Sequence, residues 1–240
     1  MSVERPFFTK PILAGVCACA TIAAAVFLIW PEIDLTIAKL FYDDGFFWRT
    51  EETNALRKIL MRAPFLLAVP LAFAILVKVI WPQSRCLLDP RPALAALFAL
   101  AMGPGLIVNG ILKEHWGRPR PTHVLSDGDP FLPPIIPWDV CATNCSFVSG
   151  EAAAGFWLIA LSLFFTGAAR VWTFWGAVVF AVVTGLLRMS FGGHFLSDVL
   201  FAFFVSYICV YWGVWLFCRT PRDVWEKRLG AIRQTNAPKR

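Results

Sequence analysis

The sequence predicts an all-α membrane protein: a six-helix transmembrane bundle with interfacial helices and a polar site that faces outward. Of its 240 residues, 58% are hydrophobic and only 16% are charged, and the mean hydropathy of +0.64 exceeds that of soluble domains. Apolar runs of about 20 residues can cross a ~30 Å hydrocarbon core. The chain contains six such runs, at 11–30, 64–81, 92–112, 147–166, 171–187 and 198–218. With no repeat or linker, we expect a single integral-membrane domain over 1–240.

The first run follows Arg5 and Lys10, as the apolar region of a signal peptide would. It is longer than such a region, and it ends in Ile29-Trp30-Pro31 without a small-residue cleavage site. We therefore expect a transmembrane helix there.

The loop 31–63 contains two stretches of helical periodicity, one around Ile33 and Ile37 and one around Leu56 and Leu60. Between them, from Phe41 to Trp48, aromatic residues flank the acidic pair Asp43-Asp44. This composition predicts a helix pair in the membrane interface. The pair is either a simple anchor or a guide for a lipid head group.

The loop charges predict the orientation. An even number of spans places both termini on one side, and Lys and Arg collect in cytoplasmic segments. Those segments hold Arg5, Lys10, Arg85, Arg91, Arg170 and the tail residues Arg219, Arg222, Lys227, Arg228, Arg233, Lys239 and Arg240. Both termini and the tail 219–240 are then cytoplasmic, and the loops 31–63, 113–146 and 188–197 face outward. The net charge of +6 lies largely in the tail, which favours contact with anionic lipid over nucleic-acid binding.

The outward loop 113–146 is rich in proline, which predicts a stiff and irregular cap. It holds Cys141 and Cys145, which either form a short-range disulfide, if that compartment is oxidising, or are two unpaired thiols. The seven cysteines of the chain show no metal-binding pattern. We expect no metal and no cofactor, and the sequence does not indicate an oligomeric state.

Basic residues stand where apolar runs meet the outward loops. Lys113, Arg120 and Arg188 do so, and Arg118 lies beside Arg120. Three or four such cations converging in one pocket would bind a tetrahedral dianion. For any one of them alone, an alternative is a side chain that snorkels to the membrane interface.

Two further pairs of residues could bind an anion or act on it. Ser149-Gly150 opens the fourth run, where free N–H groups and the helix dipole favour an anion, although a plain helix cap has the same pattern. His194 and Asp198 are four residues apart, so one helix face can hold both. A carboxylate that orients the imidazole leaves the other ring nitrogen free as a nucleophile, although a packing pair is an alternative.

Taken together, the motifs resemble the type 2 phosphatidic acid phosphatase superfamily over residues 90–215. The matching blocks are Lys113-x6-Arg120-Pro121, Ser149-Gly150 and Arg188-x5-His194-x3-Asp198. The resemblance implies a membrane phosphatase that works without a metal. In it His194 attacks phosphorus and Asp198 orients His194, and a phosphohistidine forms and is hydrolysed. The phosphoryl oxygens are held by Lys113, Arg120, Ser149, Gly150 and Arg188.

One position departs from the family pattern. Where relatives have Pro-Ser-Gly-His, this chain has Val148-Ser149-Gly150-Glu151, so Glu151 replaces the histidine that looks like the general acid. Glu151 is the predicted proton donor, which requires burial to outweigh nearby cations. The alternatives are a carboxylate paired with a basic residue, a proton from His115 or His123, or a leaving group that needs little help.

The resemblance also implies a substrate and a location. An outward site implies lipid phosphates on the periplasmic face of a bacterial inner membrane. The Phe41 to Trp48 loop and the 113–121 run look like those of bacterial members that act on lipid A. Undecaprenyl pyrophosphate and phosphatidylglycerophosphate phosphatases share most of the motif and are alternatives. A lipid transporter or scramblase is an alternative of another class, but the charges gather at one face and not at mid-membrane.

Overall fold

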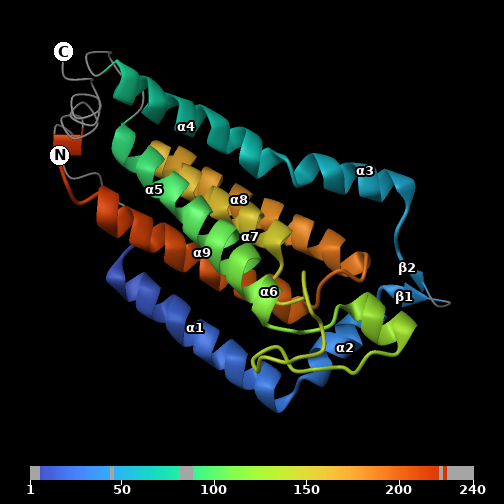
Figure 1. The fold of residues 1–240 in the computed structure, drawn as a ribbon. Coiled ribbons are helices and arrows are strands. Elements are labelled where there is room, and N and C mark those ends of the chain that lie inside the picture. Colours follow the sequence, from blue (N-terminus) through green and yellow to red (C-terminus); the bar gives the residue numbers. More distant parts are fainter. Residues whose placement is uncertain (1–5, 44–45, 82–88, 222–223, 226–240) are drawn as a thin grey trace, which may run out of the picture.

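The computed structural model describes residues 6–43, 46–81, 89–221 and 224–225, and this part of the chain is mainly helical, as predicted (Figure 1). A small antiparallel pair is formed by β1 (Tyr42–Asp43) and β2 (Phe46–Phe47). The helices are α1 (Lys10–Ile29), α2 (Glu32–Lys39), α3 (Glu51–Leu60), α4 (Ala63–Ile80), α5 (Pro90–Leu100), η1 (Ala101–Leu112), α6 (Lys113–His115), η2 (His123–Asp127), α7 (Gly150–Trp157), η3 (Leu158–Phe164), α8 (Gly167–Ser190) and α9 (Leu196–Phe217).

Five helical stretches of the described chain are long and apolar enough to cross a membrane. They are Lys10–Ile29, Glu51–Ile80, Pro90–His115, Gly167–Ser190 and Leu196–Phe217. The sixth predicted segment, 147–166, forms the shorter apolar helix Gly150–Phe164. Its eight α-helical residues at ~1.5 Å each and its seven 3-10 residues at ~2.0 Å each give a length of about 26 Å. It is shorter than predicted because the chain before Ser149 builds part of the site described below and does not continue the helix.

Helix α9 forms the centre of the bundle. It is the most buried of the five long stretches and contacts α1, α2, α5, α7 and α8. Gly213 of α9 faces the backbone of α5, where a Cβ would lie 2.5 Å from the Ala95 carbonyl oxygen. Trp157 of α7 donates its indole N–H to the Ala96 carbonyl oxygen at 2.6 Å. Such close contacts and interhelical hydrogen bonds hold helices together in lipid, where burial of apolar surface contributes little.

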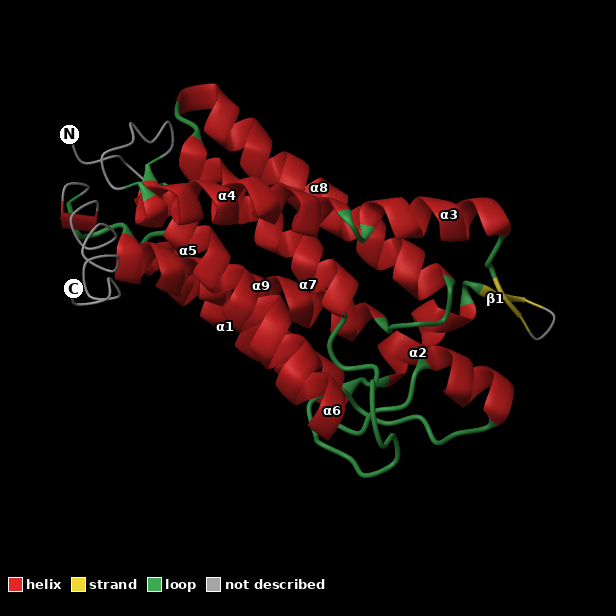
Figure 2. Ribbon diagram, turned by 45° about the horizontal axis from the view of Figure 1, so that its top comes forward, coloured by secondary structure: helices red, strands yellow, loops and turns green. Residues whose placement is uncertain are grey.

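The two ends of the bundle carry different groups. At the left-hand end of Figure 1, α1 and α5 begin and α4 and α9 end, and there Arg91 donates to the Thr220 carbonyl oxygen at 3.4 Å. At the opposite end lie α2, the hairpin, α6 and the long loop before α7, which is green in Figure 2. All the predicted site residues belong to elements at this second end, which we call the loop end.

Several residues used for the orientation prediction lie outside the described part of the chain. They are Arg5, Arg85 and, in the tail, Arg222, Lys227, Arg228, Arg233, Lys239 and Arg240.

Replacing Gly213 with alanine is expected to lower the melting temperature of the detergent-solubilised protein. The new Cβ meets a backbone oxygen at 2.5 Å, so α5 and α9 must separate. Overpacking of this kind costs about 1–3 kcal/mol. Gly176 of α8 is the matched control, because a Cβ there meets nothing within 4 Å. Equal melting temperatures for Gly213→Ala and Gly176→Ala would contradict the packing described.

Candidate active site

The loop end brings together the predicted site residues from four parts of the chain. Lys113 opens α6 directly after η1, and Ser149 caps the start of α7. Arg188 lies in the last turn of α8, and His194 lies two residues before α9 begins. Two glycines mark the close approaches. A Cβ at Gly150 would lie 3.1 Å from Lys113 Nζ, and one at Gly193 would lie 2.4 Å from an Arg188 guanidinium nitrogen. The glycines therefore leave room for the cationic groups beside the backbone.

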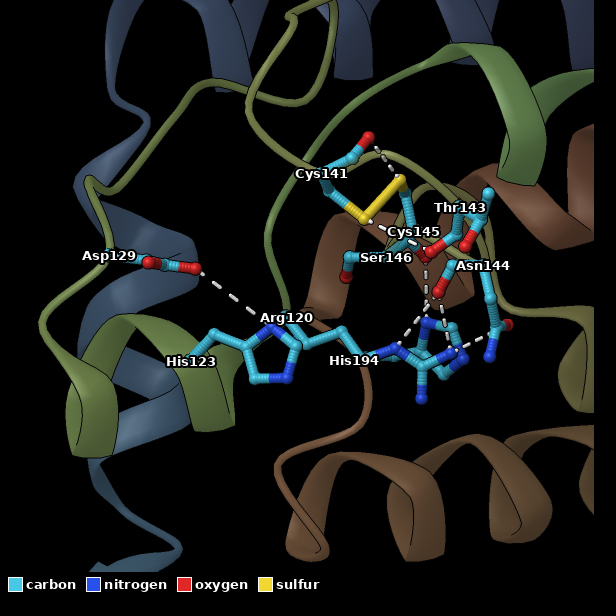
Figure 3. Close-up of a disulfide and its surroundings, with 9 residues drawn as sticks. All are labelled: Arg120, His123, Asp129, Cys141, Thr143, Asn144, Cys145, Ser146 and His194. Carbon is cyan, nitrogen blue, oxygen red and sulfur yellow. Dashed lines mark hydrogen bonds and ion pairs between the residues drawn. A yellow bond between two sulfur atoms is a disulfide. The ribbon is translucent and has the colours of Figure 1, made fainter.

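His194 is buried and its tautomer follows from its contact. Its Nδ1 lies 2.8 Å from the carbonyl oxygen of Ser146 (Figure 3). A carbonyl only accepts hydrogen bonds, so Nδ1 carries the hydrogen and Nε2 of the neutral ring keeps its lone pair. Burial lowers the pKa of His194 to about 4, against the raising effect of Asp198. The imidazole is therefore neutral near pH 7, as a nucleophile must be.

Asp198 lies in the first turn of α9, next to His194. Its Oδ2 is 3.6 Å from His194 Nδ1, which is longer than a hydrogen bond. The carboxylate instead accepts hydrogen bonds from the Ser146 hydroxyl and, at 2.8 Å, from the backbone N–H of Phe195. Asp198 thus acts on His194 through its charge and by holding Ser146, whose carbonyl oxygen binds the ring.

Arg118 is not a phosphate ligand but the centre of a buried ion-pair network. Its guanidinium donates to Asp198 Oδ1 at 2.7 Å and to Asp34 Oδ2 at 2.8 Å. All three side chains are 0% exposed. Ser197 completes the network, since its backbone N–H donates to Asp34 at 2.8 Å and its hydroxyl accepts from Arg118 at 3.0 Å. The sequence placed Arg118 among the anion-binding cations because it adjoins Arg120. A charge with two carboxylate partners and no exposed surface has no place for substrate.

Asp34 and Ser197 were not found from the sequence. One signal was present: Asp34 shares a face of α2 with Ile37 and Ala38, and both Asp34 and Ala38 are buried. An acidic residue on the apolar face of an amphipathic helix requires a buried cation as its partner.

Arg120 is held at the site by the loop 113–146, which we call the cap loop. Its guanidinium donates to the backbone oxygen of Asn144 and to its side-chain Oδ1, both at 2.8 Å. Asn144 lies between Cys141 and Cys145, which form a disulfide, so the bridged alternative for these cysteines is confirmed (Figure 3). The backbone N–H of Cys145 also donates to the Lys113 carbonyl oxygen at 2.9 Å. One short bridged loop therefore braces Arg120 and the segment that carries Lys113.

Ser149 and Gly150 form the N-terminus of α7. Ser149 is the N-cap, with its hydroxyl accepting from Ala152 N–H at 3.4 Å and its own N–H donating to the Asp198 carbonyl oxygen at 3.1 Å. Gly150 packs against both Lys113 and Asn109, whose Oδ1 would be 2.7 Å from a Cβ at position 150. The positive end of the helix dipole therefore lies beside the Lys113 ammonium group, an arrangement that favours an anion.

Glu151 forms an ion pair with Arg57, a residue of α3 that the sequence did not place at the site. Arg57 Nε lies 3.1 and 3.0 Å from the two carboxylate oxygens, and Nη2 lies 2.5 Å from Oε1. Arg188 Nε is 3.4 Å from the same Oε1. Burial raises the pKa of Glu151, but the hydrogen bonds of Arg57 and the charges of Arg188 and Arg57 outweigh it, so the net pKa lies below its ordinary value. Of the roles left open by the sequence, these contacts support the ion pair.

The two loop histidines are placed differently from His194. His115 is exposed at the end of α6. His123 is about half exposed, and its Nδ1 lies 3.9 Å from Asp129. In Figure 3 its ring points towards Asp129. No contact with the described residues joins either one to the site.

Comparisons with known proteins identify the family of the chain. A family described as "PAP2 superfamily" matches residues 92–221. A lipid A 4'-phosphatase of Francisella tularensis subsp. novicida (strain U112) is 37% identical over 206 residues, which are 82% of this chain and 91% of that protein. Lipid A 4'-phosphatases of Rhizobium etli (strain ATCC 51251 / DSM 11541 / JCM 21823 / NBRC 15573 / CFN 42) and Rhizobium leguminosarum are 34% and 32% identical. Each of these two covers 77% of this chain, and the matches span 79% and 87% of the respective relatives. No solved structure matches the chain.

The family match covers more than half of the chain, and it includes all the predicted site residues from Lys113 to Asp198. The resemblance stated from the motifs is thereby confirmed. The chain belongs to the PAP2 superfamily and is a phosphoric monoester hydrolase.

Proposed function

We propose that the chain is a lipid A phosphatase of the bacterial inner membrane, which works without a metal ion and through a phosphohistidine intermediate. The observation that carries this proposal is the state of His194. Its Nδ1–H is engaged by the Ser146 carbonyl oxygen, so the Nε2 lone pair is free, and its charge neighbours include Lys113 and Arg188. A neutral imidazole beside a cationic anion-binding site is equipped to attack a phosphoryl group.

In the first step Nε2 of His194 bonds to phosphorus while the bond from phosphorus to the lipid oxygen breaks. The electron pair leaves on that oxygen, which takes up a proton. The phosphorylated ring carries a positive charge, and the Asp198 carboxylate, 3.6 Å from Nδ1, stabilises it. Water then attacks phosphorus while the bond from phosphorus to Nε2 breaks and its electron pair returns to the ring. One proton of the water goes back to the group that protonated the lipid oxygen, and phosphate leaves with the oxygen of the water.

The remaining groups stabilise the transferring phosphoryl. Lys113, Arg120 and Arg188 and the N-terminus of α7 at Gly150 supply positive charge where negative charge spreads over three oxygens. This is the task that a metal ion performs in other phosphatases. Glu151 stays the predicted proton donor, and it can donate only in a state in which it carries a proton.

The substrate proposal rests on the relatives. Three proteins named lipid A 4'-phosphatase resemble this chain at 32–37% identity over at least 77% of its length. An apolar bundle with its site at one end suits a substrate whose acyl chains stay in the bilayer and whose phosphate lies at the surface.

Two features support a site that faces the periplasm and termini that face the cytoplasm. The loop end holds the disulfide Cys141–Cys145, and disulfides persist in oxidising compartments. The other end holds Arg91 and Arg219, which fit the cytoplasmic side.

The purified protein is expected to release phosphate from lipid A more efficiently than from undecaprenyl pyrophosphate, phosphatidylglycerophosphate or phosphatidate, and to do so in the presence of a chelator. His194→Ala should reduce the rate at least about a thousandfold, since a nucleophile is lost. The substrate preference and the effect of His194→Ala are both measured as phosphate release from lipids in mixed micelles. The variant must melt like the wild type. Full activity in His194→Ala, or no activity on any of these lipids, would overturn the proposal.

His194 is expected to stay neutral down to unusually low pH. Because its folded pKa is about 4, the ring gains a proton only as the pH falls through that value. The chain has three histidines, so the double variant His115→Gln/His123→Gln leaves His194 as the sole labelled ring in a ¹⁵N-histidine NMR titration. A titration midpoint near 6.5 would contradict the buried, neutral nucleophile.

A further inference from the structure

Arg57 reaches the catalytic end from a part of the chain outside the family match. It belongs to α3, whereas the match begins at residue 92. Yet its partner Glu151 is in the middle of the matched region, directly after Ser149-Gly150. The side chains of Arg57 and Glu151 are 23% and 20% exposed, so the pair is open to a ligand that enters from the surface.

The carboxylate of Glu151 is shared by two guanidinium groups. Arg57 contacts both of its oxygens, and Arg188 approaches Oε1 at 3.4 Å. Arg188 Nε is buried, and among the described residues it has no hydrogen-bond partner. Arg188 is one of the proposed phosphoryl ligands, so Glu151 stands between a ligand of the phosphoryl group and Arg57.

Positive charge exceeds negative charge around Glu151. The titratable groups that face it are Arg57 from α3, Arg188 from α8, Lys113 after η1, Arg120 from the cap loop and the neutral His194. Four cations thus surround one carboxylate, because Asp198 is paired with Arg118. A phosphate monoester brings up to two negative charges and three oxygens, whereas a carboxylate brings one charge and two oxygens. Guanidinium forks bind both groups in the same bidentate manner.

We propose that Arg57 is an additional phosphoryl-binding residue, that Glu151 holds it in place in the empty site, and that the incoming phosphate displaces Glu151 from it. This inference rests on the proposed function and extends the same site. When Arg57 has moved to the phosphoryl oxygens, Glu151 stands beside a dianion without its main partner. Both changes favour the protonated carboxyl that proton donation to the lipid oxygen requires.

The proposal predicts opposite effects of two substitutions on the binding of orthophosphate. Arg57→Gln removes a ligand and should weaken binding about tenfold, the order expected for a hydrogen bond to a charged group. Glu151→Gln removes a competitor and should tighten binding about tenfold. The dissociation constants are measured by equilibrium dialysis of radiolabelled orthophosphate against the detergent-solubilised full chain.

Lys58→Gln is the matched control, because Lys58 is the exposed neighbour of Arg57 on α3 and should leave binding unchanged. If Arg57→Gln does not fold, as judged by its melting curve, Arg57→Lys replaces it and should weaken binding about threefold, since it keeps the charge but loses the fork. A structural pair alone would give a different result, with both substitutions weakening binding or neither changing it. Either result overturns the proposal.

The binding of orthophosphate and its release from lipid together distinguish the role proposed for Arg57 from the phosphatase function proposed for the whole chain. If the wild type binds orthophosphate and dephosphorylates lipid but Arg57→Gln binds as tightly as the wild type, only the role of Arg57 is wrong. If the wild type binds no orthophosphate and releases none from any lipid, both proposals fail.

Discussion

The buried ion pairs of Arg118 are the interaction on which the rest of the site depends. Arg118 lies between Asp34 of α2 and Asp198 of α9, and none of the three side chains is exposed. A buried charge without a partner is strongly destabilising, so the cap loop, α2 and the start of α9 must take up one mutual arrangement. Asp198 then holds Ser146, and Ser146 holds His194. The tautomer of His194 is thus set at the end of a chain of contacts that starts in α2.

Around this neutralised centre the site carries surplus positive charge. Among the described residues, Lys113 and Arg120 form no ion pair, and Arg188 lies near one carboxylate, that of Glu151 at 3.4 Å. Glu151 therefore balances only part of their charge. The disulfide loop 141–145 and the two glycines at 150 and 193 keep these groups in place without adding charge. Arg118 is therefore saturated by its two carboxylate partners, whereas Arg120 and Arg188 keep positive charge that our proposal assigns to binding a phosphoryl group. Glu151, the residue expected to depart from the family pattern, has an arginine on either side of its carboxylate: Arg57 and Arg188.

Much of the fold follows from composition. Long apolar runs predict helices that cross a membrane, because a helix satisfies its own backbone in lipid. The described part of the chain contains five helical stretches long and apolar enough to do so. The run at 147–166 is the exception. Its apolar residues Phe147 and Val148 are buried, but in a loop of the site and not in a helix. Hydropathy indicates that a residue is buried away from water, but it does not indicate whether that residue lies in a helix or in a loop.

The sequence by itself determined the superfamily and the helical class with apolar helices long enough to cross a membrane, because these features rest on residue type and on short spacings such as that from His194 to Asp198. Only the tertiary structure decided the partners. It paired Arg118 with Asp34, Glu151 with Arg57 and His194 with Ser146, across separations of 84, 94 and 48 residues. Contacts over such distances in the chain depend on how helices pack and on where buried charges find compensation, and no local pattern encodes either. For that reason Arg118 and Arg120, two residues apart in the sequence, have different partners: two carboxylates for Arg118 and Asn144 for Arg120.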